Sequence, residues 1–309
     1  LAPLGTAQAR SKAARERGER LREDEPAPAA EAARIDAGPF SLLINLQGTW
    51  FERDARGDAV RGLDGDSTAA EIGLDWRLSD RVVLGALAGL ERVDYDFDAE
   101  APGVNFTPAS RAGEADADNA YLTLFANFAV GDHGFIELSG GYERSDGDYV
   151  RNPVFQESTR AVPQRDARLE GSADGTTTWV GINGGWDFQR GATSIGPFAG
   201  VTWTRAELDP YTERDPLGSG LAMSFSGTDR DSLLAHAGLR ISRAFSTGSG
   251  VLLPQLRLEY QRELENDRPA ASSRLVLDGA GTRYELAGGK GDDDALNGGL
   301  SLVAVLPNG

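Results

Sequence analysis

Beyond the first 39 residues, apolar and polar side chains alternate along the chain with a period of two. In the segment 70–78, for example, Ile72 and Leu74 fall on one face, whereas Glu71 and Asp75 fall on the other. This period predicts β-strands whose two faces meet different surroundings. The pattern recurs in segments of roughly ten residues, the length that a tilted strand needs to cross a bilayer. The ten predicted strands are 42–50, 70–78, 82–90, 122–130, 136–142, 180–188, 195–203, 233–241, 252–260 and 296–306.

The connections between the predicted strands alternate in length. Short turns occupy 79–81, 131–134, 190–193 and 246–250. Long polar loops occupy 54–66, 98–117, 145–175, 206–229 and 264–294. Short turns at one end of the strands and long loops at the other are typical of an outer-membrane barrel. We therefore expect an all-β fold, a transmembrane antiparallel up-and-down β-barrel.

The two faces of the predicted strands differ in chemistry. One face carries Glu, Asp, Arg, Gln and Gly, and a soluble core could not bury so many ions without large desolvation costs. A water-filled lumen accommodates them, which favours a membrane barrel over a soluble β-sandwich that binds a ligand. The other face is aliphatic, with aromatic residues near the strand ends, as expected where a barrel meets the two membrane–water interfaces. The predicted aromatic girdle consists of Trp50, Trp76, Tyr142, Trp186, Trp203 and Tyr260.

Charge is distributed unevenly between the N-terminal segment and the rest of the chain. Residues 1–22 hold six basic and two acidic side chains, whereas the remaining 287 residues hold 25 basic and 46 acidic ones. Residues 5–25 are rich in strong helix formers, and Pro26 and Pro28 end this predicted helix. The helix is polar all round, so it would lie in water or in a wet channel. The asymmetry favours contact between the two oppositely charged parts, with a solvated basic tail as the alternative.

Composition excludes several classes of function. The chain of 309 residues has no cysteine, which excludes disulfides, thiolate metal sites and cysteine nucleophiles. A net charge of −17 argues against general nucleic-acid binding. Of the two histidines, His133 lies in a short turn, and His236 faces the predicted lumen, where we expect a hydrogen bond rather than a general base. No EF-hand spacing occurs, so we expect no metal site. With only two histidines and no cysteine, we also expect no catalytic residue and no cofactor.

Four stretches of the chain, taken in their order and spacing, resemble one family. They are AAEIGLDWRLSDRVVLGALAGL (69–90), LLAHAGLRISRAF (233–245), GVLLPQLRLEYQRE (250–263) and LNGGLSLVAVLPNG (296–309). The chain resembles the translocator domain of classical (type Va) autotransporters. The resemblance implies a linker helix over residues 1–38 and an outer-membrane barrel over 39–309. It also implies a Gram-negative outer membrane with lipid and lipopolysaccharide around the barrel, insertion by the barrel-assembly machinery, and an N-terminal passenger that reaches the cell surface.

The resemblance and the charge asymmetry together predict how the pore is filled. In this family the linker helix remains in the lumen as a plug after export. The predicted pore-helix residues are Arg10, Arg15, Arg17, Arg20 and Arg22. The predicted lumen-facing residues around them are Glu71, Asp75, Glu137, Glu143, Asp187, Arg240, Arg257, Glu259 and Glu263. The alternative is an outer-membrane porin with an open lumen, in which the basic segment is a periplasmic tail.

The C-terminal part of the sequence sets the expected number of strands. Residues 274–286 are expected to form a small hairpin in the last external loop rather than a strand of the wall. The chain then has ten wall strands, and Asn308–Gly309 lies on the short-turn side. A barrel that does not close would expose two strand edges to lipid. We therefore expect twelve strands and hypothesise that one further strand pair is absent from this chain.

Overall fold

The computed structural model describes part of the chain, and every structural statement below concerns that part. It covers residues 32–53, 62–98, 113–155, 165–247, 250–266, 271–286 and 293–305. None of these residues belongs to a helix with the length and hydrophobicity needed to cross a membrane. The predicted helix over residues 5–25 lies outside the described residues.

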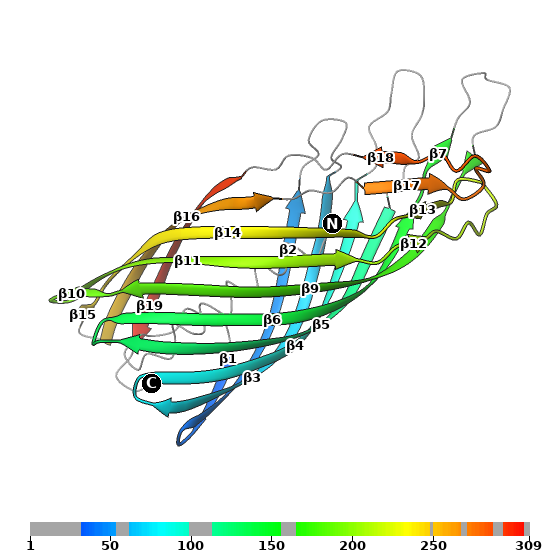
Figure 1. Cartoon of the computed structure of the whole chain (residues 1–309). Helices are drawn as coiled ribbons and strands as arrows, with labels where there is room; N and C mark the ends of the chain where they lie inside the picture. Colours follow the sequence, from blue (N-terminus) through cyan, green and yellow to red (C-terminus); the bar gives the residue numbers. More distant parts are fainter. Residues whose placement is uncertain are drawn as a thin grey trace.

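Long strands form one antiparallel sheet in which each pairs with the next long strand along the chain (Figure 1). They are β2 (Phe40–Arg53), β3 (Leu63–Ser79), β4 (Val82–Phe97), β5 (Gly113–Val130), β6 (Gly134–Arg151), β9 (Leu169–Trp186), β11 (Thr193–Leu208), β14 (Thr228–Arg243), β16 (Gly250–Asn266) and β19 (Asp294–Val305). Each predicted strand overlaps one of them, so the all-β antiparallel prediction is confirmed. Two short strands, β10 (Phe188–Arg190) and β15 (Phe245–Thr247), pair with β11 and β16 at the short-turn end.

The strands are longer than the sequence pattern predicts. Strands β5, β6 and β9 each have 18 residues, and they extend into the predicted loops 98–117 and 145–175. The reason is that the outer face becomes polar near the long-loop end, for example at Asp116 and Asp118 on β5, so apolar outer residues no longer mark the strand. The wall therefore continues beyond the apolar band that a bilayer covers.

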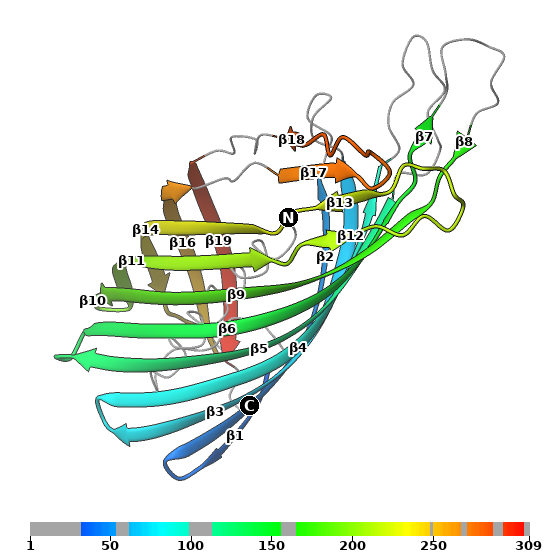
Figure 2. The ribbon, with the colours of Figure 1, turned by 45° about the vertical axis from the view of Figure 1, so that its right-hand side comes forward.

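The two ends of the described sheet are β19 and a short strand, β1 (Ala32–Ala37), which pairs with β2. No pairing between β1 and β19 joins these edges among the described residues. The sheet curves strongly in both ribbon views (Figures 1 and 2). It begins at Ala32, seven residues before the predicted boundary at residue 39, because Gly38 adopts a positive φ of 64° and lets the chain reverse into a hairpin.

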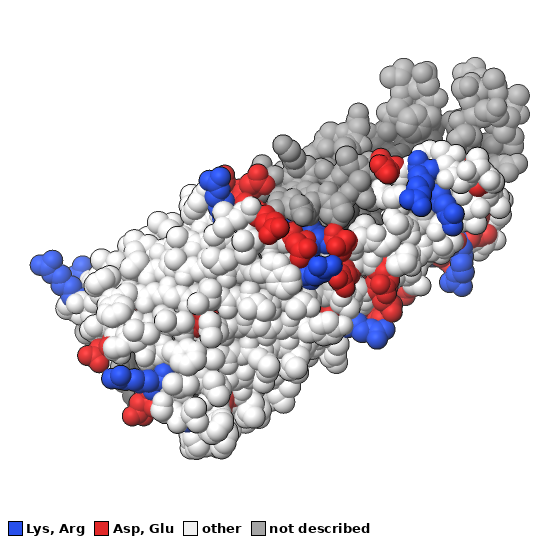
Figure 3. Space-filling view, viewed as in Figure 1, with Lys and Arg blue, Asp and Glu red and all other residues white. Residues whose placement is uncertain are grey.

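The inner, concave face of the sheet is polar and the outer face is apolar. On β3, Glu71 and Ser67 are buried, whereas the alternating Ile72 and Leu74 are exposed. The same alternation holds on β5, β6 and β9. In the space-filling view, uncharged surface covers the middle of the strands, and charged side chains gather towards their two ends (Figure 3). This arrangement is the reverse of a soluble β-protein and fits a barrel in lipid.

Three of the long connections form two small sheets at the long-loop end (Figure 2). One has four strands in the order β12 (Tyr211–Thr212), β13 (Met223–Phe225), β17 (Ala271–Leu275) and β18 (Tyr284–Leu286). The other is the pair β7 (Val154–Phe155) and β8 (Arg165–Asp166). Because β17 pairs with β13 and β18 pairs with β17, and neither pairs with the wall, the prediction that 274–286 is a loop hairpin is confirmed. Strand β19 then returns along β16, with Val305 opposite Val251 at the short-turn end.

Candidate functional site

Buried carboxylates lie on the inner face of β3, β6 and β16 and directly after the end of β9. Glu137 is 2% exposed and Glu143 is 0% exposed, although both belong to one strand, β6. Taking a carboxylate out of water costs several kcal/mol, roughly, unless hydrogen bonds and opposite charges compensate. The buried carboxylates of this inner face are Glu71, Glu137, Glu143, Asp187 and Glu259, and each was among the predicted lumen-facing residues.

Glu71 is held by two neighbours on other strands. Asn45 on β2 donates to Glu71 Oε2 at 2.7 Å, and the hydroxyl of Tyr121 on β5 donates to Oε1. Tyr121 reaches Glu71 by lying across Gly89 on β4, where an added Cβ would lie 2.3 Å from Tyr121 Cζ. The absence of a side chain at Gly89 therefore permits a contact between strands that are not adjacent. Sequence periodicity placed Glu71 on this face, but it gave no sign of Tyr121.

A second ring crosses a glycine on the same face. Trp179 on β9 is buried and lies over Gly141 on β6, where an added Cβ would be 2.1 Å from Trp179 Cζ2. It packs with Leu87 and Tyr121 in an apolar cluster that Leu43 extends. On the inner face, this apolar cluster therefore lies beside the row of cross-strand partners that contains Glu71 and Glu143.

A third group of inner side chains comes from the residue after β9 and from β11, β14 and β16. Arg240 donates to Asp187 Oδ1 at 3.2 Å, and Arg257 donates to Glu259 Oε2 at 2.8 Å. The guanidinium of Arg257 also stacks on the ring of Phe198, 4.4 Å from its centroid. These ion pairs join acids and bases that the sequence placed on one face but could not match to each other.

His236 is buried on the inner face of β14. A nitrogen of its ring lies 3.3 Å from Asn183 Oδ1. The predicted lumen hydrogen bond of His236 is confirmed. His133 is exposed in the turn between β5 and β6.

The remaining predicted lumen residues are less buried. Asp75 on β3 and Glu263 on β16 have intermediate exposure. Glu263 accepts a hydrogen bond from the hydroxyl of Ser232 at 2.9 Å. Asp75 lies on the inner side because it alternates with Leu74 and Trp76, which are exposed on the outer face.

The predicted girdle residues lie on the outer face, at two levels. Trp50, Tyr142 and Tyr260 are exposed towards the long-loop end, and Trp203 is half-buried there. The residues at the short-turn end are Trp76, which stacks with Phe40 at a centroid distance of 6.2 Å, and Trp186.

Arginines follow the apolar band directly on the outer face, and sequence reasoning missed them. They are Arg92, Arg144, Arg205 and Arg262, one on each of β4, β6, β11 and β16. Each lies two residues beyond an apolar or aromatic outer residue and pairs with an acid on the following strand. Arg144 lies 3.2 Å from Asp174, for instance, and Arg205 lies 3.2 Å from Asp229. The signal in the sequence was the recurring order of aromatic residue, Arg and acid at alternate positions, as in Tyr142, Arg144 and Asp146.

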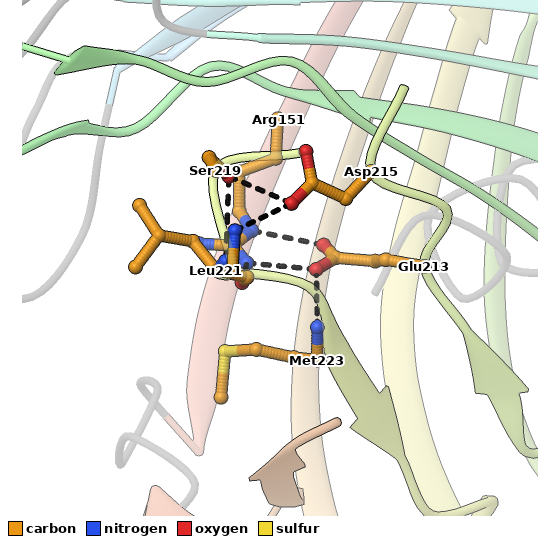
Figure 4. A network of polar contacts seen from close by, with 7 residues as sticks. Arg151, Glu213, Asp215, Ser219, Leu221 and Met223 are labelled. Carbon is orange, nitrogen blue, oxygen red and sulfur yellow. Dashed lines mark hydrogen bonds and ion pairs between the residues drawn. The ribbon is translucent and has the colours of Figure 1, made fainter. Parts of the chain in front are cut away.

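The long-loop end carries a further network, which sequence reasoning also missed (Figure 4). Arg151, the last residue of β6, donates to both carboxylate oxygens of Glu213, at 2.9 and 2.8 Å. The backbone N–H of Met223 donates to the same carboxylate at 2.9 Å, and Arg151 donates to the carbonyl of Leu221 at 3.2 Å. Asp215 closes the neighbouring turn by accepting the N–H of Gly220. These contacts attach the loop after β11 firmly to the wall.

Comparisons with known proteins agree with this architecture. A family model described as "Autotransporter beta-domain" matches residues 42–309. Among solved structures, the chain is similar to the translocator domain of the autotransporter NalP from Neisseria meningitidis, with a TM-score of 0.56, 18% identity, and coverage of 96% of this chain and 95% of that one. The ferric yersiniabactin uptake receptor FyuA from Yersinia pestis also matches, with a TM-score of 0.43, 14% identity, and coverage of 90% of this chain and 42% of that one. A search of curated proteins finds no match.

Proposed function

The chain belongs to the autotransporter β-domain family. We propose that its basic N-terminal segment fills the pore and that lipopolysaccharide contacts the outside of the barrel. The domain is the translocator of an autotransporter, an outer-membrane β-barrel through which an N-terminal passenger reaches the cell surface. Translocator domains are transport domains rather than enzymes. No observation favours the open-lumen porin named above as the alternative.

The basic N-terminal segment plugs the lumen once the passenger has left. The observation that carries this proposal is the set of buried carboxylates on the inner face, Glu71, Glu137, Glu143, Asp187 and Glu259. Asp187 and Glu259 pair with wall arginines, as described above. Residues 1–22 carry a net positive charge, which complements this acidic inner face, because opposite charge lowers the cost of burying a carboxylate. A helix is about 10 Å wide, which suits a twelve-stranded lumen.

Single-channel conductance in a planar bilayer tests the plug, using the whole β-domain with residues 1–31 present or deleted, because the wall begins at Ala32. We expect low conductance with the segment and a large increase without it. The matched variants replace Arg10, Arg15, Arg17, Arg20 and Arg22 with Gln, or replace the outer Arg92, Arg144, Arg205 and Arg262 with Gln. The first set should raise conductance and the second should not, since only the first faces the lumen in this proposal. High conductance in both the intact and the deleted form would overturn it.

The outer arginines give the barrel its contact with the outer leaflet. Arg92, Arg144, Arg205 and Arg262 follow the apolar band on alternate strands of the wall, where phosphate groups of lipopolysaccharide would lie. Guanidinium groups bind phosphate through paired N–H donors. Reconstitution into vesicles with lipopolysaccharide or with a zwitterionic phospholipid tests this contact. The thermal midpoint should be higher with lipopolysaccharide, and replacing the four arginines with Gln should abolish the difference.

Insertion by the barrel-assembly machinery and exposure of the passenger at the surface complete the proposal. A reporter passenger in the full-length precursor should become accessible to an added protease on intact cells. Depletion of the assembly machinery should leave the precursor in the periplasm. Surface exposure that persists without the machinery would contradict this part of the proposal.

A further inference from the structure

Aromatic side chains line the inner face at the long-loop end, above the buried carboxylates. We call them the aromatic collar. Its members, one from each of β2, β4, β6, β12, β13 and β18, are Phe51, Tyr95, Tyr149, Tyr211, Phe225 and Tyr284. Three of them come from the loops after β11 and β16, so the collar exists only after these loops fold against the wall.

Strand register places the collar in one row around the mouth. Residues directly opposite each other in an antiparallel pair share a face of the sheet. Phe51 is opposite Gly65, which is opposite Tyr95. Tyr95 is opposite Ala115, which is opposite Tyr149. The row therefore alternates large rings with small residues.

The row continues from the wall into the four-stranded sheet. Tyr149 is opposite Gly171, and an added Cβ on Gly171 would lie 2.8 Å from Tyr211 Cε2. Tyr211 is opposite Phe225 on β13. Phe225 is opposite Ser273, which is opposite Tyr284. In the wall this row faces inwards, because Ala115 alternates with the outer residues of β5 and is buried like Asn119 and Tyr121.

The small residues let neighbouring rings touch. Phe51 and Tyr95 have centroids 5.2 Å apart across Gly65. Tyr149 and Tyr211 stack at 5.6 Å, and Tyr211 and Phe225 stack at 4.8 Å. The rings therefore form a contacting pair, Phe51 and Tyr95, and a contacting group of three, Tyr149, Tyr211 and Phe225. These five rings are partly accessible, and Tyr284 is 48% exposed.

The collar is uncharged, although acids surround it on the outer face. Burial raises the pKa of Tyr211, which lies in the loop after β11, to about 12, so its phenol is neutral at physiological pH. One position along the strands, an outer row contains Asp94, Asp116 and Asp148. The chemistry of the mouth thus differs from that of the acidic lumen below it and of the acidic surface outside it.

The ion pair between Arg151 and Glu213 fixes the loop that carries Tyr211 and Phe225 (Figure 4). Leu169, which is fully buried, packs with Ala222 and Leu221 of the same loop. Binding to a preformed surface costs less conformational entropy than binding to a mobile loop. The collar is therefore preorganised for a ligand that passes through the mouth.

We propose that the aromatic collar binds the extended polypeptide of the passenger as it leaves the pore. This inference rests on the proposed function, which brings a polypeptide through this mouth. Ring faces suit such a ligand because apolar contact is non-directional and tolerates a changing sequence. Rings that face the pore from several strands contact the chain in turn, which slows its return towards the periplasm without holding it tightly.

Site-specific photocrosslinking in the full-length precursor tests the contact. The photoreactive residue p-benzoylphenylalanine replaces Tyr149 or Phe225, and a folded reporter stalls the passenger in transit. The matched control is Tyr142, which lies on the same strand as Tyr149 but on the outer face. We expect adducts with the passenger from both collar positions and none from Tyr142. Absence of collar adducts in a stalled precursor, or equal adducts from Tyr142, would overturn the proposal.

The rate of passenger export tests whether contact between the collar and the passenger affects translocation. Tyr149→Leu should lengthen the half-time of passenger exposure about threefold, the effect of losing roughly one aromatic contact. Tyr149→Phe retains the ring and should leave the rate unchanged. Tyr284→Leu provides a second test at an exposed position, where the fold should tolerate the change. Resistance of the folded barrel to SDS, measured in parallel, separates slow export from poor folding. Unchanged rates in both Leu variants would overturn the proposal.

Two results separate this inference from the function on which it rests. If the parental precursor inserts but exposes no passenger, the proposed function itself fails. If export is normal and the collar positions give no adducts, only the collar proposal fails. If an added oligosaccharide suppresses the adducts, the rings form a carbohydrate site, and the assignment to polypeptide is wrong.

Discussion

Glu137 and Leu138 are neighbours on β6, yet their surroundings are opposite. Glu137 is 2% exposed on the inner face, whereas Leu138 is 43% exposed on the outer face. In water this would be the wrong way round, because the charged residue is enclosed and the apolar one is not. The comparison shows that lipid is the solvent of the outer face, while the inner face satisfies its charges through side chains on other strands. The same kind of substitution should therefore change the free energy of unfolding differently on the two faces.

A charge on the outer face should have the largest effect. Leu124→Arg, at an exposed apolar position of β5, should destabilise the inserted barrel by about 2–4 kcal/mol, because lipid cannot solvate the charge at this depth. Denaturant unfolding in lipid vesicles measures the change. Tyr142→Arg is the matched control at the membrane interface, where the cost should be about 0–1 kcal/mol. Equal effects at both positions would contradict the placement of the apolar band.

Adding a side chain at a glycine of the inner face should have the second-largest effect on the free energy of unfolding. Gly141→Ala places a methyl group 2.1 Å from Trp179, so overpacking should cost about 1–3 kcal/mol. Gly299→Ala on β19 is the control, because an added Cβ there meets nothing within 4 Å. The same unfolding assay compares the two variants. A neutral result at Gly141 would mean that the ring of Trp179 moves aside freely.

Removing one hydrogen bond from a buried carboxylate should be milder. Tyr121→Phe keeps the ring over Gly89 but loses the donor to Glu71, with an expected cost of about 1.5 kcal/mol. Asn45 still donates to the other oxygen of Glu71, which limits the loss. The free energy of unfolding should fall without any change in membrane insertion. Stability equal to that of the parent would show that Glu71 does not depend on this donor.

Breaking an exposed ion pair on the outer face should have the smallest effect. Arg144→Gln removes contacts with Asp146 and Asp174, and exposed pairs of this kind contribute about 0–1 kcal/mol. In detergent the loss should shrink further as salt is added, because salt screens exposed charges. A loss of stability greater than that of Tyr121→Phe would contradict the expectation that this exposed ion pair contributes less than the buried hydrogen bond to Glu71.

Much of the wall was predictable because the alternation of apolar and polar residues along a strand reflects the surroundings of its two faces. The period of two located every long strand and assigned Glu71, Glu143 and Glu259 to one face. Their partners were not predictable, since Tyr121 reaches Glu71 only across a glycine on the strand between them. The strand ends were also missed, because the wall continues where its outer face is polar.

The sequence alone determined the class of fold, the number of long strands, their faces and the family. These features depend on short-range alternation and on the lengths of connections, both of which a linear sequence contains. Tertiary structure alone decided the aromatic collar. Tyr211, Phe225 and Tyr284 lie in segments that look like polar loops, and they join Tyr149 only after the loops pair with each other and an ion pair holds one of them to the wall. Such a row has no period along the chain, because its members are brought together by register between distant strands.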